Sequence, residues 1–583
     1  MPGRWPVCKN IPSKKSIEKG TRRPMQQKLP ERFSMTTLEK NLAALMPVNE
    51  DLVRRICLPV DGTHIHFLQG GEARYQRHRT LLPFVVGKED FLSTLGDANI
   101  GENIFLFGIG LGEQLDYLLE HFKEAGITVW DRDPWLVRLV LMQRDYSQYI
   151  GSGQLQLHMC ADLFGMLDTV KSASVICHPF LRSVYENEYK LVEDGVGKKR
   201  AIICSGDLFV DDVGKILRGF GYSLYTLEIK KLALEEIETA IQRFDPNMII
   251  AINYTNGLAE MCHSQGVDLI CWEVDPAADR LKPCNAPTDR AFIFTYRKAN
   301  VRAFIQAGFK NVEYLPLASN IEKRFPAELS LKEKESYGSS LSFVGSSMIE
   351  QAKSFRDIFL SHYKAYCGGS PNAVEEGNRL LEEILSVQRQ DLSTYRIPDL
   401  LSQYFSDFIS YLFNLPGAHN PFMLVGEIAA AEKRINYIAS LGRLGLNVWG
   451  DQGWRITEQY GVKYMGSAGH TYEINKIYSA SLVNVDINRL YQADIVTMRV
   501  FDIMACGGFV LAEYSRDLDE LFEIGKEVEA YHTLDELLSK ASYYLDHRGE
   551  ALEIAERGRE AVRNNHTIEK RVKYMLSVAM NNQ

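Results

Sequence analysis

The sequence lacks a cysteine framework, a long apolar run and an excess of positive charge. Its 583 residues include ten cysteines, which are scattered along the chain and form no C-x-x-C pair. Dispersed cysteines in apolar runs are typical of free thiols in a reducing compartment, and they argue against a disulfide scaffold or a zinc site. No stretch of about 18 apolar residues is present, so no transmembrane helix is predicted. We therefore expect a cytoplasmic protein without a membrane span or a metal site.

The charge balance disfavours one class of partner. The formal net charge is -9 at pH 7, so the chain has no general basic field for non-specific nucleic-acid binding. Only the segment 1–35 is rich in Lys, Arg and Pro without apolar periodicity. It is predicted to be a disordered basic tail, or sequence upstream of a true start at Met35. Because it contains no apolar stretch of the required length, a signal peptide is not expected.

The pattern that is present predicts a multidomain α/β protein. A chain of this length is expected to form three or four domains of roughly 150 residues each. Short apolar strands alternate with helices in three series, over residues 36–198, 199–330 and 331–583. This alternation predicts parallel sheets that are covered by helices. Three long helical stretches interrupt the last series at 349–417, which we expect to be a helical insertion.

The first series contains a glycine loop. Gly108, Gly110 and Gly112 follow the strand "NIFLF" and precede a helix, and Asp131 ends the next strand, "ITVWD". This order is typical of a loop whose backbone approaches a nucleotide while the acid binds a ribose. It suits S-adenosylmethionine as well as a dinucleotide, and a tight turn without a ligand explains it equally. A methyltransferase within residues 36–198 is therefore an alternative function.

The last series holds a second group of candidate ligand contacts. Gly345 and Ser346 follow the strand "LSFV", where backbone N–H groups could face a diphosphate, although a simple strand end is equally consistent. In "RVFDIMACGGFVLAEY", Arg499 and Asp502 lie three apart at the start of a predicted helix. Such a pair could hold a phosphate and sugar hydroxyls, or it could form an i,i+3 ion pair on the surface. Asp494 precedes this helix.

Residues from about 199 to 575 resemble the CgeB-like (spore-maturation-protein) glycosyltransferases, a GT-B group. The resemblance is carried by "RVFD", the pair Cys506-Gly507, "LDELF", "GKEV" and "DEL", and by "CWEVDP" and "YLPLASN". The "GLG" loop and the acid after its following strand resemble the Rossmann-like domain of motility-associated flagellin glycosyltransferases. The resemblance implies two Rossmann-like domains in a GT-B arrangement, 199–330 on the acceptor side and 331–583 on the nucleotide-sugar side, preceded by a third Rossmann-like domain.

The resemblance also implies an activity and its site. The expected enzyme is a hexosyl- or related transferase that moves a sugar from a nucleotide sugar to a protein or glycan acceptor, with no cofactor or metal. The implied donor-binding residues are Gly345, Ser346, Asp494, Arg499, Asp502, Gly507 and Gly508. The family usually has the longer Glu where this chain has Asp502. Glu273, Asp275 and His470 are candidates for a catalytic base, and the sequence does not choose among them. A non-catalytic scaffold, with the helices of 349–417 recruiting a partner, is a third possibility.

Overall fold

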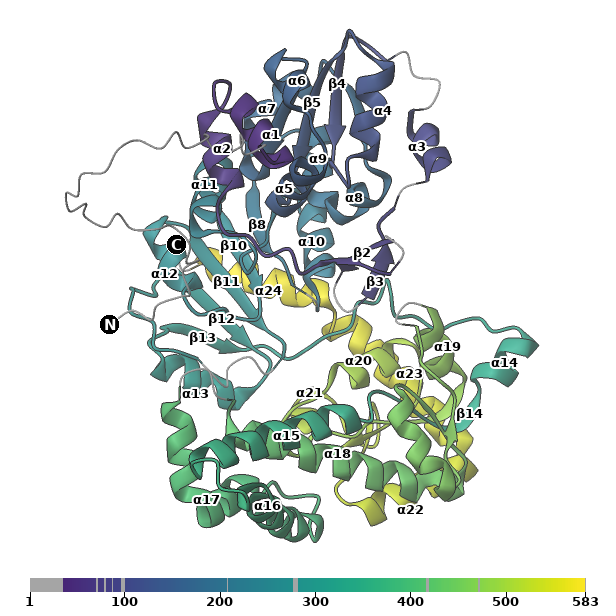
Figure 1. Ribbon diagram of the computed structural model, residues 1–583. Coiled ribbons are helices and arrows are strands. Elements are labelled where there is room, and N and C mark those ends of the chain that lie inside the picture. The colour runs from purple at the N-terminus through teal and green to yellow at the C-terminus, as the bar shows by residue number, and fades with distance from the viewer. Residues whose placement is uncertain are drawn as a thin grey trace, which may run out of the picture.

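The chain folds into three helix-covered parallel sheets, as Figure 1 shows. The computed structural model describes residues 35–69, 72–77, 80–85, 87–95, 100–206, 208–275, 281–415, 419–469 and 472–581. Within these ranges, the three parallel sheets and one small antiparallel sheet account for all of the paired strands. The α/β prediction is confirmed. The expected basic tail, up to residue 34, and His470 lie outside the described residues.

The N-terminal unit combines the antiparallel sheet with a four-stranded parallel sheet of order β6-β5-β4-β7, here called the first sheet. The small sheet consists of β1 (Ile65–Phe67), β2 (Ala73–Arg77) and β3 (Thr80–Pro83). The first sheet consists of β4 (Asn103–Phe107), β5 (Gly126–Asp131), β6 (Leu155–Met159) and β7 (Ser174–Cys177). The helices are α1 (Thr37–Leu45), α2 (Glu50–Ile56), α3 (Lys88–Leu95), α4 (Glu113–His121), α5 (Pro134–Gln143), α6 (Ser147–Gly151), α7 (Leu163–Val170), α8 (Pro179–Val184) and α9 (Glu186–Asp194), with a 3₁₀ turn at Cys160–Asp162.

The second sheet has six parallel strands in the order β13-β12-β11-β10-β8-β9. Its strands are β8 (Arg200–Cys204), β9 (Ser223–Leu227), β10 (Met248–Ile252), β11 (Asp268–Glu273), β12 (Ala291–Thr295) and β13 (Asn311–Tyr314). Its helices are α10 (Val210–Gly219), α11 (Leu234–Phe244), α12 (Leu258–Ser264) and α13 (Lys298–Gln306). The chain reverses its direction of travel across the sheet between β8 and β10. Such a switch point leaves a crevice at the carboxyl ends of the strands.

The third sheet also has six parallel strands, in the order β16-β15-β14-β17-β18-β19, and its switch point lies between β14 and β17. Its strands are β14 (Ser339–Val344), β15 (Leu446–Trp449), β16 (Lys463–Tyr464), β17 (Ser481–Val485), β18 (Val510–Glu513) and β19 (Glu529–Tyr531). Its helices are α14 (Leu331–Tyr337), α18 (Pro421–Leu441), α19 (Tyr472–Ala480), α20 (Met498–Ala505), α21 (Arg516–Leu521), α22 (Leu534–Asp546) and α23 (Arg548–Asn565), with 3₁₀ turns at Gly442–Leu444, Gln452–Tyr460 and Leu490–Gln492.

The helical insertion starts at the carboxyl edge of the third sheet. It comprises α15 (Ile349–Tyr366), α16 (Ala373–Arg389) and α17 (Ile397–Asn414). Its helices pack on α18 around an aromatic and aliphatic core of their own that includes Phe359, Leu381 and Phe408. Because α15 begins directly after β14 and its short loop, the insertion stands beside the switch point of this sheet.

The last helix, α24 (Ile568–Asn581), leaves the third sheet and returns to the second. Figure 1 shows it in yellow beside β11, and it packs against α10 and β11. Arg571 at its start donates from Nε to the carbonyl oxygen of Pro316 at 2.9 Å. The sequence assigned this segment to the range 331–583, but its apolar face, with Val572 and Met575, completes a core that both units share. Residues 568–581 therefore tie the two six-stranded sheets together.

A buried ion pair and a hydrogen bond to a buried carboxylate join the N-terminal unit to the second sheet. Arg55 donates to both carboxylate oxygens of Glu236, at 2.6 and 2.8 Å, and both side chains are buried. The fully buried Glu188 of α9 accepts from the backbone N–H of Thr226 on the edge strand β9 at 2.6 Å. An ion pair as deeply buried as that of Arg55 and Glu236 adds little net stability, because the cost of desolvation offsets the Coulomb attraction. The two contacts hold the N-terminal unit over the carboxyl end of the second sheet.

The described residues contain no candidate for a membrane span. Among the helices of the described residues, none is both long enough and apolar enough to cross a bilayer.

Candidate active site

Three arginines, here called the arginine cluster, gather at the switch point of the third sheet: Arg434 on α18, Arg489 after β17 and Arg499 on α20. The guanidinium of Arg499 pairs with Asp486, and its Nε donates to the carbonyl oxygen of Val344 at 2.8 Å. A Cβ on Gly345 would lie 3.0 Å from an Arg499 nitrogen. The glycine therefore makes room for the arginine.

No carboxylate among the described residues pairs directly with the positive charge of Arg434. Its Nη1 donates to the carbonyl oxygen of Ser346 at 2.9 Å and its Nη2 to that of Ile487 at 3.4 Å. Within the described residues Arg434 has no ion-pair partner, and its Nε has no hydrogen-bond partner. Burial, together with the like charges of Arg499 and Arg489, lowers the pKa of Arg434 to about 9. An anion at this point would relieve both effects.

Arg489 is held by a hydroxyl and a carboxylate of its own unit. Its Nη1 donates to the Tyr491 hydroxyl at 3.0 Å and lies 3.5 Å from the carboxylate of Glu427. Burial would lower the pKa of Arg489, but Tyr491 and Glu427 outweigh it, and the charge of Asp275 on the second sheet adds to the rise. The charge of Asp275 thus favours the protonated form of Arg489. Sequence reasoning missed Arg434 and Arg489, since only the fold brings them to Arg499.

The loop after β14 is tied to protein groups. The N–H of Gly345 donates to the carbonyl oxygen of Trp449 at 3.0 Å, and the Ser346 hydroxyl donates to Asp451 at 2.7 Å. Asp451 also accepts from the N–H of Ser347 at 2.7 Å. In contrast to the sequence prediction, the N–H of Gly345 does not face a ligand space. The loop instead positions the Ser346 carbonyl oxygen for Arg434.

Asp494 and Asp502 both contact the unit of the second sheet. Asp494 accepts from Arg297 Nε with both oxygens, at 3.0 and 2.8 Å, across the gap between the two sheets. Asp502 is buried and accepts from the Ser319 hydroxyl at 2.6 Å and from Arg324 Nε at 3.1 Å. Burial raises the pKa of Asp502, and Arg324 offsets part of the rise. Arg499 and Asp502 therefore form no ion pair with each other, and a role of either acid in donor binding stays a prediction.

Gly507 and Gly508 lie at the amino ends of the strands of the third sheet, whereas the arginine cluster lies at the carboxyl ends. The helix α20 starts near the carboxyl edge and runs towards the amino end of β18, so the glycine pair is remote from the arginine cluster. A Cβ on Gly508 would lie 2.6 Å from the carbonyl oxygen of Tyr478, and Gly507 has a φ of 72°. In contrast to the prediction of donor contacts, both glycines are required by the turn into β18.

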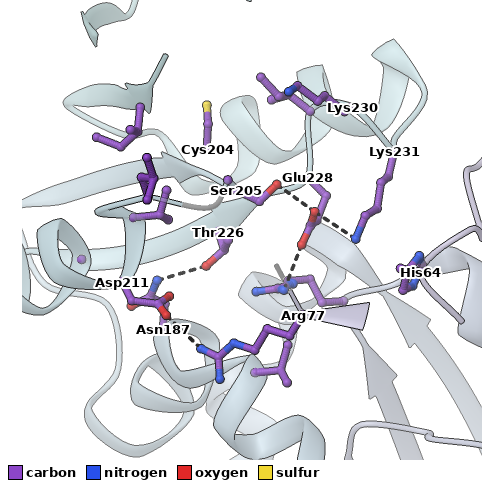
Figure 2. Close-up of a pocket in the computed structure, with 18 of the residues that line it drawn as sticks. His64, Arg77, Asn187, Cys204, Ser205, Asp211, Thr226, Glu228, Lys230 and Lys231 are labelled. Atoms are coloured by element: carbon purple, nitrogen blue, oxygen red, sulfur yellow. Dashed lines mark hydrogen bonds and ion pairs between the residues drawn. The ribbon is translucent and has the colours of Figure 1, made fainter. Parts of the chain in front are cut away.

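The carboxyl edge of the second sheet borders a cavity of about 490 Å³. Figure 2 shows this cavity, here called the interunit cavity, because the N-terminal unit forms one wall and the second sheet the other. Glu228 lines the cavity and accepts from the Ser205 hydroxyl at 2.7 Å and from Arg132 at 3.2 Å. Burial would raise the pKa of Glu228, but Arg132 and Lys231 outweigh it and lower the pKa.

The base candidates differ in their positions. Glu273 is fully buried and accepts a hydrogen bond from the Asn300 side chain of its own unit at 3.0 Å. It is not among the residues that line the cavity. Asp275 is exposed and lines the interunit cavity, and its charge contributes to the raised pKa of Arg489. His470 falls outside the described residues. Of the two described candidates, Asp275 is the one that a substrate could reach.

The glycine loop of the N-terminal unit is filled by the protein itself. Asp131 is fully buried and accepts from the N–H of Ile109 at 2.8 Å and from the Tyr185 hydroxyl at 2.9 Å. Burial raises the pKa of Asp131 to about 7. A Cβ on Gly110 would overlap the His178 ring.

The other two glycines of this loop are also closely packed, since Gly108 lies against Leu181 and Gly112 against Arg144. All three glycines have positive φ. In contrast to the prediction, Asp131 secures the loop instead of meeting a ribose. This packing gives no support to the methyltransferase alternative. Among the described residues, no group of three or more His, Cys, Asp or Glu side chains is arranged to hold a metal ion.

A protein-family model matches part of the chain. Residues 431–577 match the family model described as glycosyl transferase-like, a span that contains the whole arginine cluster. A search of curated proteins finds no match.

Similar solved structures include three proteins. A glycosyltransferase from Rickettsia africae is 10% identical, with coverage of 66% of this chain and 99% of that chain and a TM-score of 0.43. Anabaena HepE in complex with UDP and glucose is 13% identical, with coverage of 66% and 100% and a TM-score of 0.38. Sucrose-phosphate synthase from Thermosynechococcus elongatus is 10% identical, with coverage of 66% and 99% and a TM-score of 0.38. These are distant likenesses of fold.

Proposed function

We propose that the protein is a glycosyltransferase that moves a hexosyl or related sugar from a nucleotide-sugar donor to a protein or surface-glycan acceptor. The observation that carries the proposal is the unbalanced charge of Arg434 at the switch point of the third sheet. Ligands of doubly wound sheets bind at such switch points. The match of residues 431–577 to the glycosyl transferase-like family supports the same assignment.

In this proposal the arginine cluster holds the donor diphosphate. The acceptor hydroxyl oxygen attacks the anomeric carbon, the bond from that carbon to the diphosphate oxygen breaks, and the diphosphate leaves with the bonding electrons. Negative charge grows on the leaving group, so fixed cations stabilise the transition state more than the ground state. Arg489 and Arg499 supply charge beside Arg434, without a metal or a further cofactor. Asp275 is our candidate to take the proton of the acceptor hydroxyl.

A thermal-shift panel tests the donor assignment. The full-length chain is mixed with UDP-, GDP-, ADP- and CMP-sugars, and we expect at least one of them to raise the melting temperature. Arg489→Gln should weaken binding of that nucleotide sugar about tenfold or more, because a hydrogen bond to a charged group contributes about 1.5–3 kcal/mol.

The matched control is Arg379→Gln, which removes an exposed arginine that pairs with Glu383 on α16. It should leave nucleotide-sugar binding unchanged. The proposal fails if no nucleotide sugar stabilises the protein, or if Arg489→Gln binds the donor as tightly as the unchanged chain does.

A further inference from the structure

The interunit cavity is built from two units that are far apart in the sequence. The N-terminal unit supplies residues from the β1–β2 hairpin, the end of β5 and the start of α9, and the second sheet supplies the carboxyl ends of β8, β9 and β10. The volume of about 490 Å³ falls in the range of small-molecule sites. The cavity also lies at the switch point between β8 and β10, where doubly wound sheets bind ligands.

The backbone is strained on two sides of this cavity. Phe209, at the start of α10, has a φ of 60°, and Asn253, directly after β10, has a φ of 64°. Left-handed conformations of non-glycine residues cost about 1–3 kcal/mol and concentrate at functional sites. Asn253 Oδ1 accepts from the N–H of Val274 at 2.8 Å and of Asp275 at 3.1 Å. The strained residue thereby fixes the loop that carries Asp275.

The charges around the cavity are largely balanced within the protein, unlike the charge of Arg434. Arg77 donates to Asp211 at 3.2 Å, as Figure 2 shows, and Arg218 pairs with Glu186 at 2.7 Å. The N-terminus of α10 would attract a phosphate, but Asp211 and Asp212 occupy its first turn. Because these cations already have acidic partners, the cavity favours an uncharged ligand over a phosphorylated one.

The remaining lining suits hydroxyl groups. Side chains that both donate and accept hydrogen bonds surround the space, among them Ser205, Thr226 and Asn187. His64 is only 4% exposed and lines the cavity, and its Nδ1 has no hydrogen-bond partner in the described part of the chain. A ligand hydroxyl would satisfy this buried atom. The rings of Tyr75 and Tyr254 add apolar surface of the kind that packs on a sugar face.

We propose that the interunit cavity binds the acceptor as an uncharged carbohydrate, and that the N-terminal unit forms half of this acceptor site. The inference rests on the proposed glycosyltransferase function. Asp275, our candidate for the proton acceptor, lines the cavity shortly after β11, and its charge favours the protonated form of Arg489 in the arginine cluster. The N-terminal unit is therefore a part of substrate recognition in this protein.

Saturation-transfer NMR on the full-length chain tests the site. The probes are glucose, galactose, rhamnose and N-acetylglucosamine, with glucose 6-phosphate as the charged comparison. We expect at least one uncharged sugar to bind, and glucose 6-phosphate to bind no better than glucose. Ser183→Trp should weaken the sugar signal at least tenfold, because exposed Ser183 lines the cavity from the N-terminal unit and a tryptophan there fills the space. Arg77→Gln should also weaken it, by a smaller factor.

The matched control is Ser172→Trp. Ser172 is exposed, belongs to the same unit and donates to the carbonyl oxygen three residues before it, as Ser183 does, but it lies outside the cavity. It should change neither sugar binding nor the nucleotide-sugar thermal shift, and Ser183→Trp should leave that thermal shift intact.

The outcomes separate the two proposals. The inference is overturned if none of the uncharged sugars binds, if binding survives Ser183→Trp, or if glucose 6-phosphate binds more tightly than glucose. Nucleotide-sugar binding without sugar binding would remove the acceptor site and keep the donor site. Sugar binding without any nucleotide-sugar binding would instead overturn the glycosyltransferase proposal, and the acceptor role would fall with it.

Discussion

The two six-stranded sheets have the same architecture at their carboxyl edges but differ in how completely their charges are paired. At the second sheet, the charged side chains pair with one another around a cavity, as Arg77 does with Asp211. At the third sheet, Arg434 is buried beside two further arginines and lacks a carboxylate partner among the described residues. The shared topology creates a crevice in both places. Side chains from outside each sheet, on the N-terminal unit and on α18, decide which chemistry the crevice favours.

The two carboxyl edges should differ most in the unfolding free energy that is lost when one arginine is removed from each. Arg499→Ala leaves Asp486 buried without its cation, and breaking such a pair costs about 3–5 kcal/mol of unfolding free energy. Arg77→Ala breaks a partly exposed pair at the second sheet and should cost at most about 1 kcal/mol. Urea unfolding followed by circular dichroism measures both. Equal losses for the two variants would contradict the contrast between the edges.

The pH dependence of ligand binding should separate the edges next. The pKa of Arg434 is lowered to about 9, so the side chain is charged below that pH and loses its proton above it. A bound anion favours the charged form, so nucleotide-sugar affinity should fall by up to about tenfold per pH unit above pH 9. Titration calorimetry between pH 7.5 and about pH 10 measures the slope.

Two controls accompany this titration. Arg434→Gln should bind the nucleotide sugar weakly, and its affinity should not change through this pH range. Binding of an uncharged sugar to the interunit cavity should also stay constant. A donor affinity that is unchanged up to pH 10 would show that Arg434 does not interact with the bound anion.

The smallest loss of unfolding free energy is expected at the ion pair that links the two carboxyl edges. Arg297→Gln removes the ion pair with Asp494, whose side chains are 25% and 43% exposed, so the unfolding free energy should fall by at most about 1 kcal/mol. The difference from the unchanged chain should shrink in about 1 M salt, because exposed charges are screened. A loss above about 2 kcal/mol, or one insensitive to salt, would mean that this pair behaves as a buried contact.

Local pattern was sufficient for much of the fold. The alternation of apolar strands with helices predicts the parallel sheets, and the helical periodicity of 349–417 corresponds to α15, α16 and α17. The site was predicted only in part. Arg499 and Asp275 were named from the sequence, whereas Arg434 and Arg489 were not, because each contributes through neighbours that the fold brings together. The glycines were misinterpreted because a glycine needed by a turn and a glycine needed by a ligand look alike in sequence.

The sequence by itself determined the elements, since hydrophobic periodicity and turn residues act over a few positions. It also determined where cations and acids stand along the chain. Only the tertiary structure decided which of these charges are balanced. Asp502 is paired with Arg324 and Arg499 with Asp486, while Arg434 is left without a carboxylate partner among the described residues. The physical reason is that electrostatic compensation depends on distance and burial in three dimensions, and neither is a property of sequence separation.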